Sequence, residues 1–505
     1  MSISFNQIPA NWRLPLYYAE VDPSKAGQNV LDQPALIWGH KLASGSATLD
    51  VPVPVGSLNQ AQALFGIGSM LERSVAAFLK NDQASEIWCI PVAEPAAGVV
   101  AAGSFTVTGP ATAAGTLSVY IAGQLVEIAV ASGDTATAIA TALAAAINGS
   151  ATLPVTAAAA AGVVTTTARW KGLTGNDIRL AVNLGGVSAG QALPGGVGVA
   201  IVQMTGGTGT PLLGNAIAGL GDDPYEYVSF PWNDSTSLNA IEAEFGFGDA
   251  GRWGWLRQLY GHVFSAYRGT YSSLIAFGAG RNSGVTSILE IEPDMPTPIW
   301  EVAAAYTAQA ARSLLNDPAR PLQTLPLYGV AGAPKGSRFR ASERNTLTMS
   351  GFAVQDVRAD GTVQIVREQT TYQTNAYGVT DTAYGLVTTL ATLARLFRNQ
   401  KQVITSKYGR HKLANNGTRF GPGQAIVTPN TIRAELVAQY AADEYDGLVE
   451  NLAAFKTGLI VERDSGNPDR LNILYDPDLV NQLRMFAVLA QFRLQFAANA
   501  SETTA

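Results

Sequence analysis

The sequence is poor in several residue types and patterns, and each absence narrows the class of protein. Its 505 residues include a single cysteine, Cys89, which excludes an internal disulfide framework and fits assembly in a reducing cytoplasm. Its apolar runs, such as residues 155–164, fall far short of the ~20 residues that a membrane-spanning helix needs. The N-terminus lacks the basic segment and continuous apolar core of a signal peptide. We therefore expect a soluble, intracellular protein with no membrane insertion.

Charge is also scarce. Charged residues make up 14% of the chain, against 47% apolar residues and 51 glycines. A large protein with so little charge is expected to meet other protein more than water, and so to be part of an assembly. The formal net charge of −6 gives no general nucleic-acid-binding signature. A chain of this length is expected to form two to four domains.

Both ends of the chain carry strand-like patterns. Near the N-terminus, large apolar residues alternate with others around a proline, which predicts an edge strand or an extended arm: Trp12, Leu14, Leu16 and Tyr18. Near the C-terminus, apolar residues alternate with polar ones, which predicts a half-buried strand over residues 488–496: Ala490, Phe492, Leu494 and Phe496. Just before it, residues 458–463 and 470–475 flank a Ser/Gly/Asn/Pro turn and predict a hairpin. A terminal strand with one apolar face requires a sheet with which to pair.

Between these ends, strand and helix patterns alternate over residues 33–95 and again over residues 210–333. We predict one discontinuous α/β domain from these two parts, with a buried strand at residues 34–39 and helices that begin after Ser57 and Ser69, where capping boxes occur. Residues 334–484 predict a C-terminal α+β domain with a hairpin turn at Asp360-Gly361 and a helix over residues 382–398. Residues 1–32 and 485–505 are then terminal arms, and the fold class is multidomain, α/β and α+β.

Residues 96–209 interrupt this pattern. There is no Lys or Arg between Lys80 and Arg169, and Ala, Gly, Thr and Val dominate the segment. Its Thr/Val runs predict strands, and Asp134 is expected to cap a helix that ends at Asn148-Gly149. Glycine pairs at 185–186, 195–196 and 206–207 are plausible linkers. The segment predicts a small β-rich domain inserted at the outer surface of the α/β domain.

Residues 382–434 contain no acidic residue and eight basic ones, whereas the helix that follows is acidic, with Glu435, Asp443 and Glu444 among its residues. Such reciprocal patches suit repeated copies that meet each other, or a charged partner. A solvated face is the common alternative, and binding of nucleic acid is disfavoured because only Tyr408 and Phe420 are aromatic between residues 401 and 433.

Short matches to catalytic motifs occur, but their surroundings favour turns. Residues 246–251 match G-x-G-x-x-G without directly following a predicted strand, and residues 186–190 match G-x-S-x-G without a following helix. The histidines His40, His262 and His411 are isolated from cysteines and carboxylates at metal-ligand spacing, and no Walker A sequence is present. We expect no catalytic residue, no cofactor and no metal, and thus no enzyme.

Six short motifs of the sequence occur together as a set: Ser4–Pro15, Leu64–Leu71, Asp317–Leu322, Leu325–Val330, Arg367–Asn375 and Lys407–Leu413. In combination they resemble the tail sheath proteins of contractile bacteriophage tails, in particular those of Mu-like phages. The resemblance covers about residues 1–95 and 210–500, and the insert resembles the variable outer domain of such proteins.

The resemblance implies a structural subunit of the virion, assembled in the host cytoplasm into a helical polymer of stacked, usually hexameric rings. Its partners would be the tail tube protein, the baseplate and the tail terminator, with no nucleic acid. It also implies that the terminal arms pair with sheets of neighbouring subunits, that residues 22–33 and 478–484 serve as hinges during contraction, and that the C-terminal domain faces the tube. The candidate tube-facing residues are Arg395, Arg398, Lys401, Lys407, Arg410, Lys412 and Arg419.

Two alternatives remain at this point. The sheath of a related contractile injection system, such as an R-type bacteriocin or a secretion system, shares nearly all of these features. An α/β hydrolase or dehydrogenase is the alternative from another class, and it is disfavoured because the sequence holds no catalytic constellation.

Overall fold

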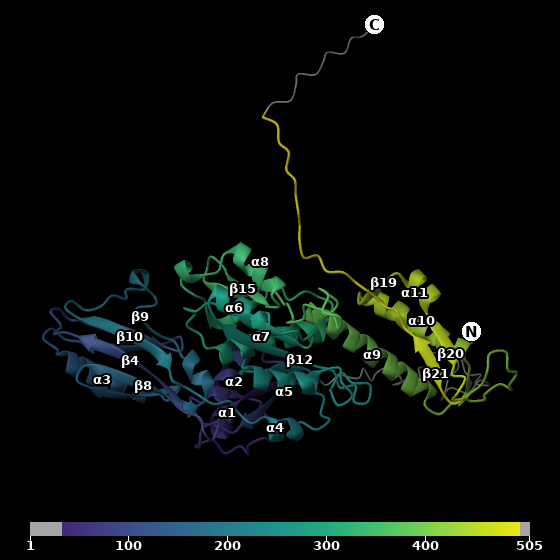
Figure 1. Cartoon of the computed structure of the whole chain (residues 1–505), viewed down its shortest axis with the longest axis horizontal. Helices are drawn as coiled ribbons and strands as arrows, with labels where there is room; N and C mark the ends of the chain where they lie inside the picture. The colour runs from purple at the N-terminus through teal and green to yellow at the C-terminus, as the bar shows by residue number, and fades with distance from the viewer. Residues whose placement is uncertain (1–32, 495–505) are drawn as a thin grey trace, which may run out of the picture.

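A computed structural model describes residues 33–494 of the chain. The molecule is elongated (Figure 1): the insert forms one end, an α/β body lies in the middle, and helix α9 leads to a smaller C-terminal lobe at the other end. A tail leaves the surface between the body and this lobe and points away from both. The mixed α/β, multidomain architecture is the one that the sequence predicts.

The body is built on a six-stranded sheet with the order β13-β12-β11-β1-β3-β2. All neighbours pair in parallel except β2 and β3. Most of its strands are buried at nearly every position, as expected for a parallel sheet covered on both faces. The strands are β1 (Ala35–His40), β2 (Val53–Pro54), β3 (Ile87–Val92), β11 (Tyr227–Ser229), β12 (His262–Arg268) and β13 (Thr286–Ile291). Strand β1 pairs with strands from both sides of the insert, so the two α/β parts of the sequence form one sheet.

Helices pack against this sheet, and their starts follow the sequence. The Ser57 and Ser69 hydroxyls accept hydrogen bonds from the Gln60 and Glu72 amides at 3.3 and 3.0 Å, which confirms both predicted caps. Helix α7 is buried along most of its length and packs on α2 and on β12. The helices are α1 (Leu58–Phe65), α2 (Met70–Asn81), α4 (Gly214–Gly219), α5 (Ser235–Phe245), α6 (Tyr271–Gly278) and α7 (Ile299–Asn316).

The insert contains one α-helix, α3 (Ala136–Gly149), and two sheets, ordered β10-β4-β8-β7 and β6-β5-β9. The predicted cap of α3 is wrong by one residue. The Thr135 hydroxyl caps the helix through the Ala138 amide, at 3.2 Å, whereas the Asp134 carboxylate accepts from the Ala131 amide of the preceding turn. The strands are β4 (Val100–Thr108), β5 (Gly115–Ile121), β6 (Gln124–Val130), β7 (Val155–Ala160), β8 (Val163–Lys171), β9 (Leu180–Val182) and β10 (Gly198–Thr205).

In the insert, where charge is scarce, asparagine side chains form hydrogen bonds with exposed backbone groups. The Asn148 amide bonds both to the N–H and to the C=O of Ala157 in the edge strand β7, at 2.9 and 2.7 Å. In the same way, the Asn176 side chain accepts from the Gly207 amide at 2.8 Å and donates to the Gly207 carbonyl at 2.9 Å. The Gly206-Gly207 pair, expected as a linker, is therefore held in place. An amide that occupies both backbone groups of an edge residue blocks pairing by another strand there.

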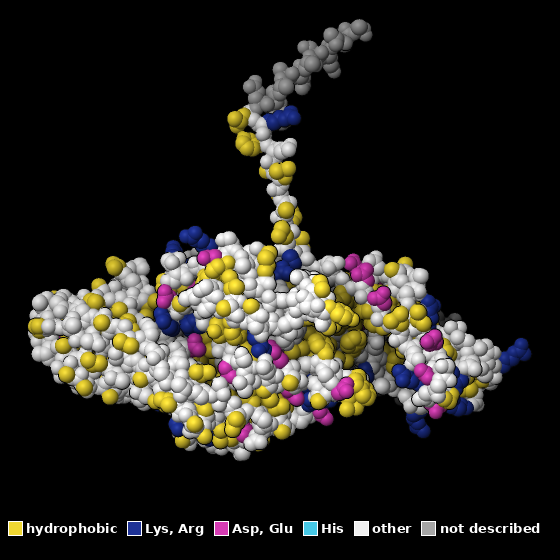
Figure 2. Space-filling view, viewed as in Figure 1, with side chains coloured by type: hydrophobic (Ala, Val, Ile, Leu, Met, Phe, Trp, Pro, Cys, Tyr) yellow, Lys and Arg dark blue, Asp and Glu magenta, His cyan; other side chains and the backbone are white. Residues whose placement is uncertain are grey.

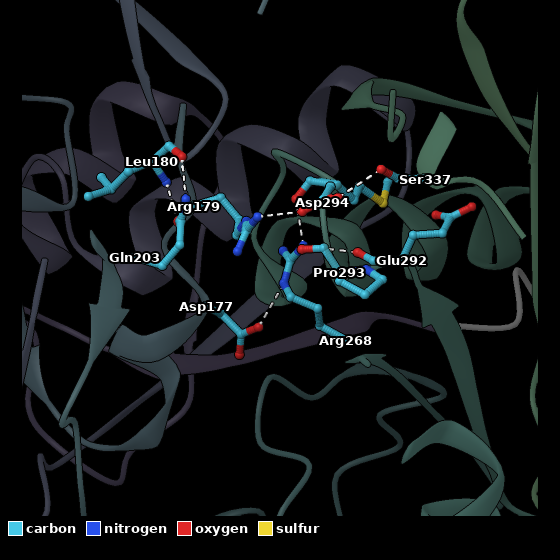
Figure 3. A network of polar contacts seen from close by, with 10 residues as sticks. Asp177, Arg179, Leu180, Gln203, Arg268, Glu292, Pro293, Asp294 and Ser337 are labelled. Atoms are coloured by element: carbon cyan, nitrogen blue, oxygen red, sulfur yellow. Dashed lines mark hydrogen bonds and ion pairs between the residues drawn. The ribbon is translucent and has the colours of Figure 1, made fainter. Parts of the chain in front are cut away.

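Arg268, the last residue of β12, ties the insert to the body (Figure 3). Its Nε donates to the Asp177 carboxylate of the insert at 3.1 Å, and its Nη atoms donate to the Met295 and Thr297 carbonyls of the body at 2.5 and 2.7 Å. A second ion pair nearby, Arg179–Asp294 at 2.7 Å, is more exposed.

A second joint lies around Arg73 of α2. The guanidinium pairs with Glu301 of α7 and donates from Nη1 to the Thr152 carbonyl of the insert at 2.9 Å. Nearby, the indole of Trp170 in the insert meets that of Trp300 edge to face, with ring centroids 5.4 Å apart. Buried apolar residues of the insert and body form one continuous core, so the insert is a fixed part of the body.

A three-stranded sheet, β14-β16-β15, adds to the body. The predicted turn at Asp360-Gly361 is confirmed: Gly361 has φ +89°, and the Asp360 carboxylate accepts from the Thr362 amide at 2.9 Å. This sheet meets the central one where Ala353 bridges to Leu289 of β13. Its elements are β14 (Pro326–Ala331), α8 (Ala341–Met349), β15 (Val354–Val357) and β16 (Thr362–Arg367).

The division between body and C-terminal lobe lies later in the chain than residue 334, where the sequence places it. Buried residues up to Leu390 belong to the core of the body, and those from Leu396 onward form a second core. Both residues are in α9 (Val387–Tyr408), which is longer than the predicted helix. One continuous helix therefore connects the two cores.

The C-terminal lobe packs around Tyr440 and Phe455, whose rings stack with centroids 3.8 Å apart. Its hairpin of β20 and β21 is confirmed, with Ile460 opposite Leu474. Apart from α10, the elements of the lobe are short. They are β17 (Lys412–Leu413), β18 (Ile426–Val427), α10 (Pro429–Tyr445), β19 (Val449–Glu450), α11 (Leu452–Gly458), β20 (Ile460–Arg463), β21 (Leu471–Leu474) and β22 (Asp478–Leu479).

Two carboxyl groups are buried where the central sheet meets the small one. Glu290 is fully buried; its Oε1 accepts from the Gln355 amide at 3.2 Å, and its Oε2 has no partner among the described residues. Glu292, the first residue after β13, accepts from the Gln355 side chain at 2.7 Å. Burial raises the pKa of the Glu290 carboxyl well above its usual value; Glu292 and Asp356 raise this pKa further, and Arg344 lowers it.

Replacement of Glu290 by Gln is expected to stabilise the protein at neutral pH by about 1 kcal/mol or more. Because the pKa is raised in the folded state, the unfolded chain loses its proton first, near pH ~4.3, and wild-type stability falls as pH rises from there toward the folded pKa. In urea unfolding between pH 4.5 and 8, the free energy of unfolding should fall less steeply with pH for E290Q than for the wild-type protein. The exposed Glu462→Gln serves as control, and equal slopes for E290Q and wild type would contradict the prediction.

Candidate functional site

The tail is the most conspicuous surface feature. Residues 480–494 are extended and pair with no strand among residues 33–494. From Leu483 onward, its large apolar side chains are between 70 and 96% exposed: Leu483, Met485, Phe486, Val488, Leu489, Phe492 and Leu494. Such a run of exposed apolar side chains indicates a surface that another chain covers. No strand among the described residues pairs with the strand predicted at residues 488–496, so that strand remains a prediction. Phe496 lies outside the described residues.

The base of the tail is anchored. The Arg484 guanidinium donates to both oxygens of the Glu368 carboxylate, one of them at 2.9 Å, and this carboxylate is fully buried. The Gln482 side chain donates to the Ala319 carbonyl, and Gln323 donates to the Leu483 carbonyl at 3.3 Å. Residues 478–484, expected as a hinge, are thus fixed to the body here, because a buried carboxylate requires a charged partner. The segment without such contacts begins at Met485.

The hairpin β20–β21 is the second candidate surface. No further strand pairs with either edge among the described residues. Its turn is ordered by the Asp464 carboxylate, which accepts from the Gly466 and Asn467 amides at 2.8 Å. A two-stranded hairpin is of marginal stability by itself, and its open edges can accept added strands. The structure therefore leaves unpaired strand edges on the lobe and an unpaired segment at the tail.

The predicted tube-facing residues divide into two groups. Arg395 and Arg398 point into the molecule: Arg395 donates to the Leu315 carbonyl at 2.8 Å, and Arg398 pairs with the buried carboxylate of Glu226. Lys407 pairs with Glu435 of α10, so the basic segment and the acidic helix already meet within one chain. Sequence spacing could not show this, because the partners lie on different elements.

The remaining candidates, Lys401, Arg410, Lys412 and Arg419, are exposed. The last three lie on the segment that joins α9 to β18, and Figure 2 shows Lys and Arg side chains projecting from the outer end of the lobe. A role for these residues toward the tube remains a prediction. The arm residues Trp12, Leu14, Leu16 and Tyr18 lie outside the described residues.

An apolar groove, which sequence reasoning missed, runs along α9 between body and lobe. We call it the α9 groove. Figure 2 shows apolar side chains gathered in the hollow between body and lobe. Its volume is about 490 Å³, within the ~300–1,000 Å³ typical of clefts that hold a ligand. Its main apolar walls are Trp253, Trp255, Tyr260, Phe397, Ile404 and Leu436. The aromatic cluster at residues 253–260 was the one sequence signal that could have indicated it.

The histidines form no site. Burial lowers the pKa of His40 to about 4 and that of His262 to about 3, so both are neutral near pH 7. His411 is exposed on the lobe. Within residues 33–494, no cluster of three or more His, Cys, Asp or Glu side chains could hold a metal ion. None of the helices in this range is long and apolar enough to cross a membrane.

Comparison with protein families gives two matches. Residues 206–371 match the phage tail sheath protein central domain, and residues 379–493 match the phage tail sheath C-terminal domain. Over 496 residues, the chain is 42% identical to the Mu-like prophage FluMu tail sheath protein of Haemophilus influenzae, covering 98% of this chain and 100% of the relative.

Solved structures are more distant. The crystal structure of a sheath tail protein from Desulfitobacterium hafniense is 11% identical, with a TM-score of 0.48, and the match covers 93% of this chain and 97% of that one. A sheath tail protein from Listeria innocua is 10% identical, also with a TM-score of 0.48, over 90% of this chain and 93% of that one. The helical sheath of the anti-feeding prophage in its contracted state is 10% identical, with a TM-score of 0.45, over 96 and 100% of the two chains.

Proposed function

Because this chain belongs to the phage tail sheath protein family, we propose that it is the structural subunit of a contractile phage tail sheath. It polymerises around the tail tube in a metastable extended state, as stacked hexameric rings between baseplate and terminator. On contraction it drives the tube through the host envelope. Its place is the virion, after assembly in the host cytoplasm.

The observation that carries the proposal is a pair of complementary surfaces on one chain. The tail presents alternating apolar side chains and unpaired backbone, and the β20–β21 hairpin presents open strand edges. Strand addition joins such surfaces, with backbone hydrogen bonds supplying attachment and alternate side chains supplying register. The tail points away from the lobe of its own chain in Figure 1, so its backbone groups cannot pair with the β20–β21 hairpin of the same chain. The tail of one copy therefore pairs with the sheet of another, and contacts of this head-to-tail kind build helices.

The same structure supports a contraction driven by packing. The insert and the α/β sheet share a core and two polar joints, so they move as one rigid body. The flexible connection of this proposal begins at Met485, because the described side chains of residues 485–494 are exposed. Arms then keep copies connected while the rigid bodies rotate and move outward into a better-packed arrangement. The energy is stored in the extended sheath behind a kinetic barrier, with no nucleotide needed.

Electron microscopy of the purified protein tests the proposal directly. Tubes of uniform width, and shorter and wider tubes after a contraction trigger, are expected. A protein that remains monomeric at high concentration in the presence of tail tubes would contradict it.

Charge reversal at the outer end of the lobe should weaken loading on the tube. The triple variant Arg410→Glu, Lys412→Glu and Arg419→Glu is expected to reduce sheath on tubes on the order of tenfold, because like charges then oppose an acidic partner. Co-sedimentation with purified tubes measures this. The control has the same change in charge at exposed residues of the body, Arg312, Arg320 and Lys335. Equal loading by both triple variants would rule out a tube-facing role for this end of the lobe.

A further inference from the structure

The α9 groove is open, apolar and rich in aromatic side chains. Trp255, on its rim, is 71% exposed, an unusual position for so large an apolar surface. Its walls come from the body, from α9 and from the lobe, so an occupant would contact all three. Exposed apolar grooves of this kind are binding sites for apolar segments.

The N-terminal segment leaves the body beside this groove. The Pro34 carbonyl accepts from the Glu226 amide at 3.1 Å, and the Gln33 side chain accepts from the Tyr227 hydroxyl at 3.3 Å. The Glu226 carboxylate binds Arg398. The Arg398 guanidinium lies over the Tyr260 ring, 5.1 Å from its centroid, and Tyr260 lines the groove. A short series of direct contacts thus leads from the start of the described chain to the groove wall.

The preceding residues contain a segment of fitting chemistry. Its apolar side chains occur at every second position from Trp12 to Tyr18, so an extended backbone places them on one side. The residues between Tyr18 and Gln33 span tens of ångströms when extended, at ~3.3–3.6 Å per residue. A tether of this length holds a segment near its own groove at an effective concentration of about millimolar.

The C-terminal tail is a weaker candidate. Its base is fixed through Glu368 and Ala319, and neither residue lines the groove. We propose that the α9 groove is the docking site of the segment Trp12–Tyr18 of the same chain. The consequence rests on the proposed function: a docked segment cannot pair with another copy until the subunit joins a sheath.

Cross-linking tests the docking. The one native cysteine, Cys89, is fully buried, so introduced cysteines react alone. A Leu16→Cys, Thr405→Cys variant is treated with a short bismaleimide in dilute solution, which favours reaction within one chain. Thr405 lines the groove, whereas Ser406 is exposed on the same helix and does not, so Leu16→Cys with Ser406→Cys is the matched control. An intramolecular product, identified by peptide mass spectrometry, should form about tenfold more with the Thr405 pair.

Addition of Trp255→Ala should lower that yield without a change in the unfolding temperature, because this side chain is exposed. Equal yields from the Thr405 and Ser406 pairs would overturn the proposal. Products between two chains only would overturn it as well and assign the groove to a second copy. Electron microscopy of the same variants distinguishes the docking proposal from the sheath proposal. Variants that form sheaths but give no intramolecular product would contradict the docking and leave the sheath function standing.

Discussion

A chain that ends at Arg484 is expected to fold as the full-length protein does and to form no sheaths. The truncation keeps the Arg484–Glu368 ion pair and every element of the lobe, and it removes a segment whose described side chains are exposed. Backbone groups and apolar side chains that join one copy to the next are lost, so polymerisation should fall by orders of magnitude. Circular dichroism and thermal unfolding check the fold, and electron microscopy checks assembly.

The matched control ends at Asn499, which retains the alternating segment through Phe496 and should still polymerise. Long sheaths from the chain ending at Arg484 would show that the tail is not the coupling between copies. A lowered unfolding temperature in that chain alone would instead indicate that the tail stabilises the subunit.

Replacement of Arg268 by Met should lower the free energy of unfolding by about 3 kcal/mol, because the side chains of Arg268 and Asp177 are only 11 and 18% exposed and one partner is removed from a largely buried ion pair. The change leaves the Asp177 carboxylate without its closest cation (Figure 3). It also leaves the carbonyls of Met295 and Thr297 without a donor. Urea unfolding followed by tryptophan fluorescence measures it, since Trp170 and Trp300 lie at the joint between insert and body.

The same network supplies the control. Arg179–Asp294 also joins insert and body, but its side chains are 24 and 47% exposed, so Arg179→Gln should cost about 1 kcal/mol or less. A double variant, Arg268→Met with Asp177→Asn, should recover part of the loss because no carboxylate is then stranded. Equal effects of the two arginine substitutions would show that the buried pair does not hold the insert.

Local features were predictable from the sequence because their causes lie within a few residues. The caps at Ser57 and Ser69 and the turns at Asp360-Gly361 and residues 464–469 depend on side chains that reach the nearest backbone amides. The helix cap predicted at Asp134 was wrong because Asp134 and Thr135 can both accept hydrogen bonds from backbone amides. The path of the preceding turn directs Asp134 to that turn and leaves Thr135 to cap the helix.

The basic segment illustrates where sequence reasoning fails. Eight like charges in one stretch predict a single face, yet Arg398 pairs with Glu226 in the interior and Lys407 pairs with Glu435. A helix as long as α9 shows different sides to the body, to the lobe and to solvent, so neighbouring charges have different surroundings. The domain boundary was misplaced for a related reason, since one helix contributes to both cores.

The sequence by itself determined the local elements, the low charge of the insert, the family and the presence of alternating apolar segments at both ends. It could do so because period, composition and motif are properties of neighbouring residues. Only the tertiary structure decided that Arg268 fixes the insert, that Arg484 fixes the tail and that an aromatic groove opens where the chain enters the body. Each of these depends on residues far apart in the chain, and their meeting is set by the topology of the sheet and the direction of α9 and not by any spacing along the sequence.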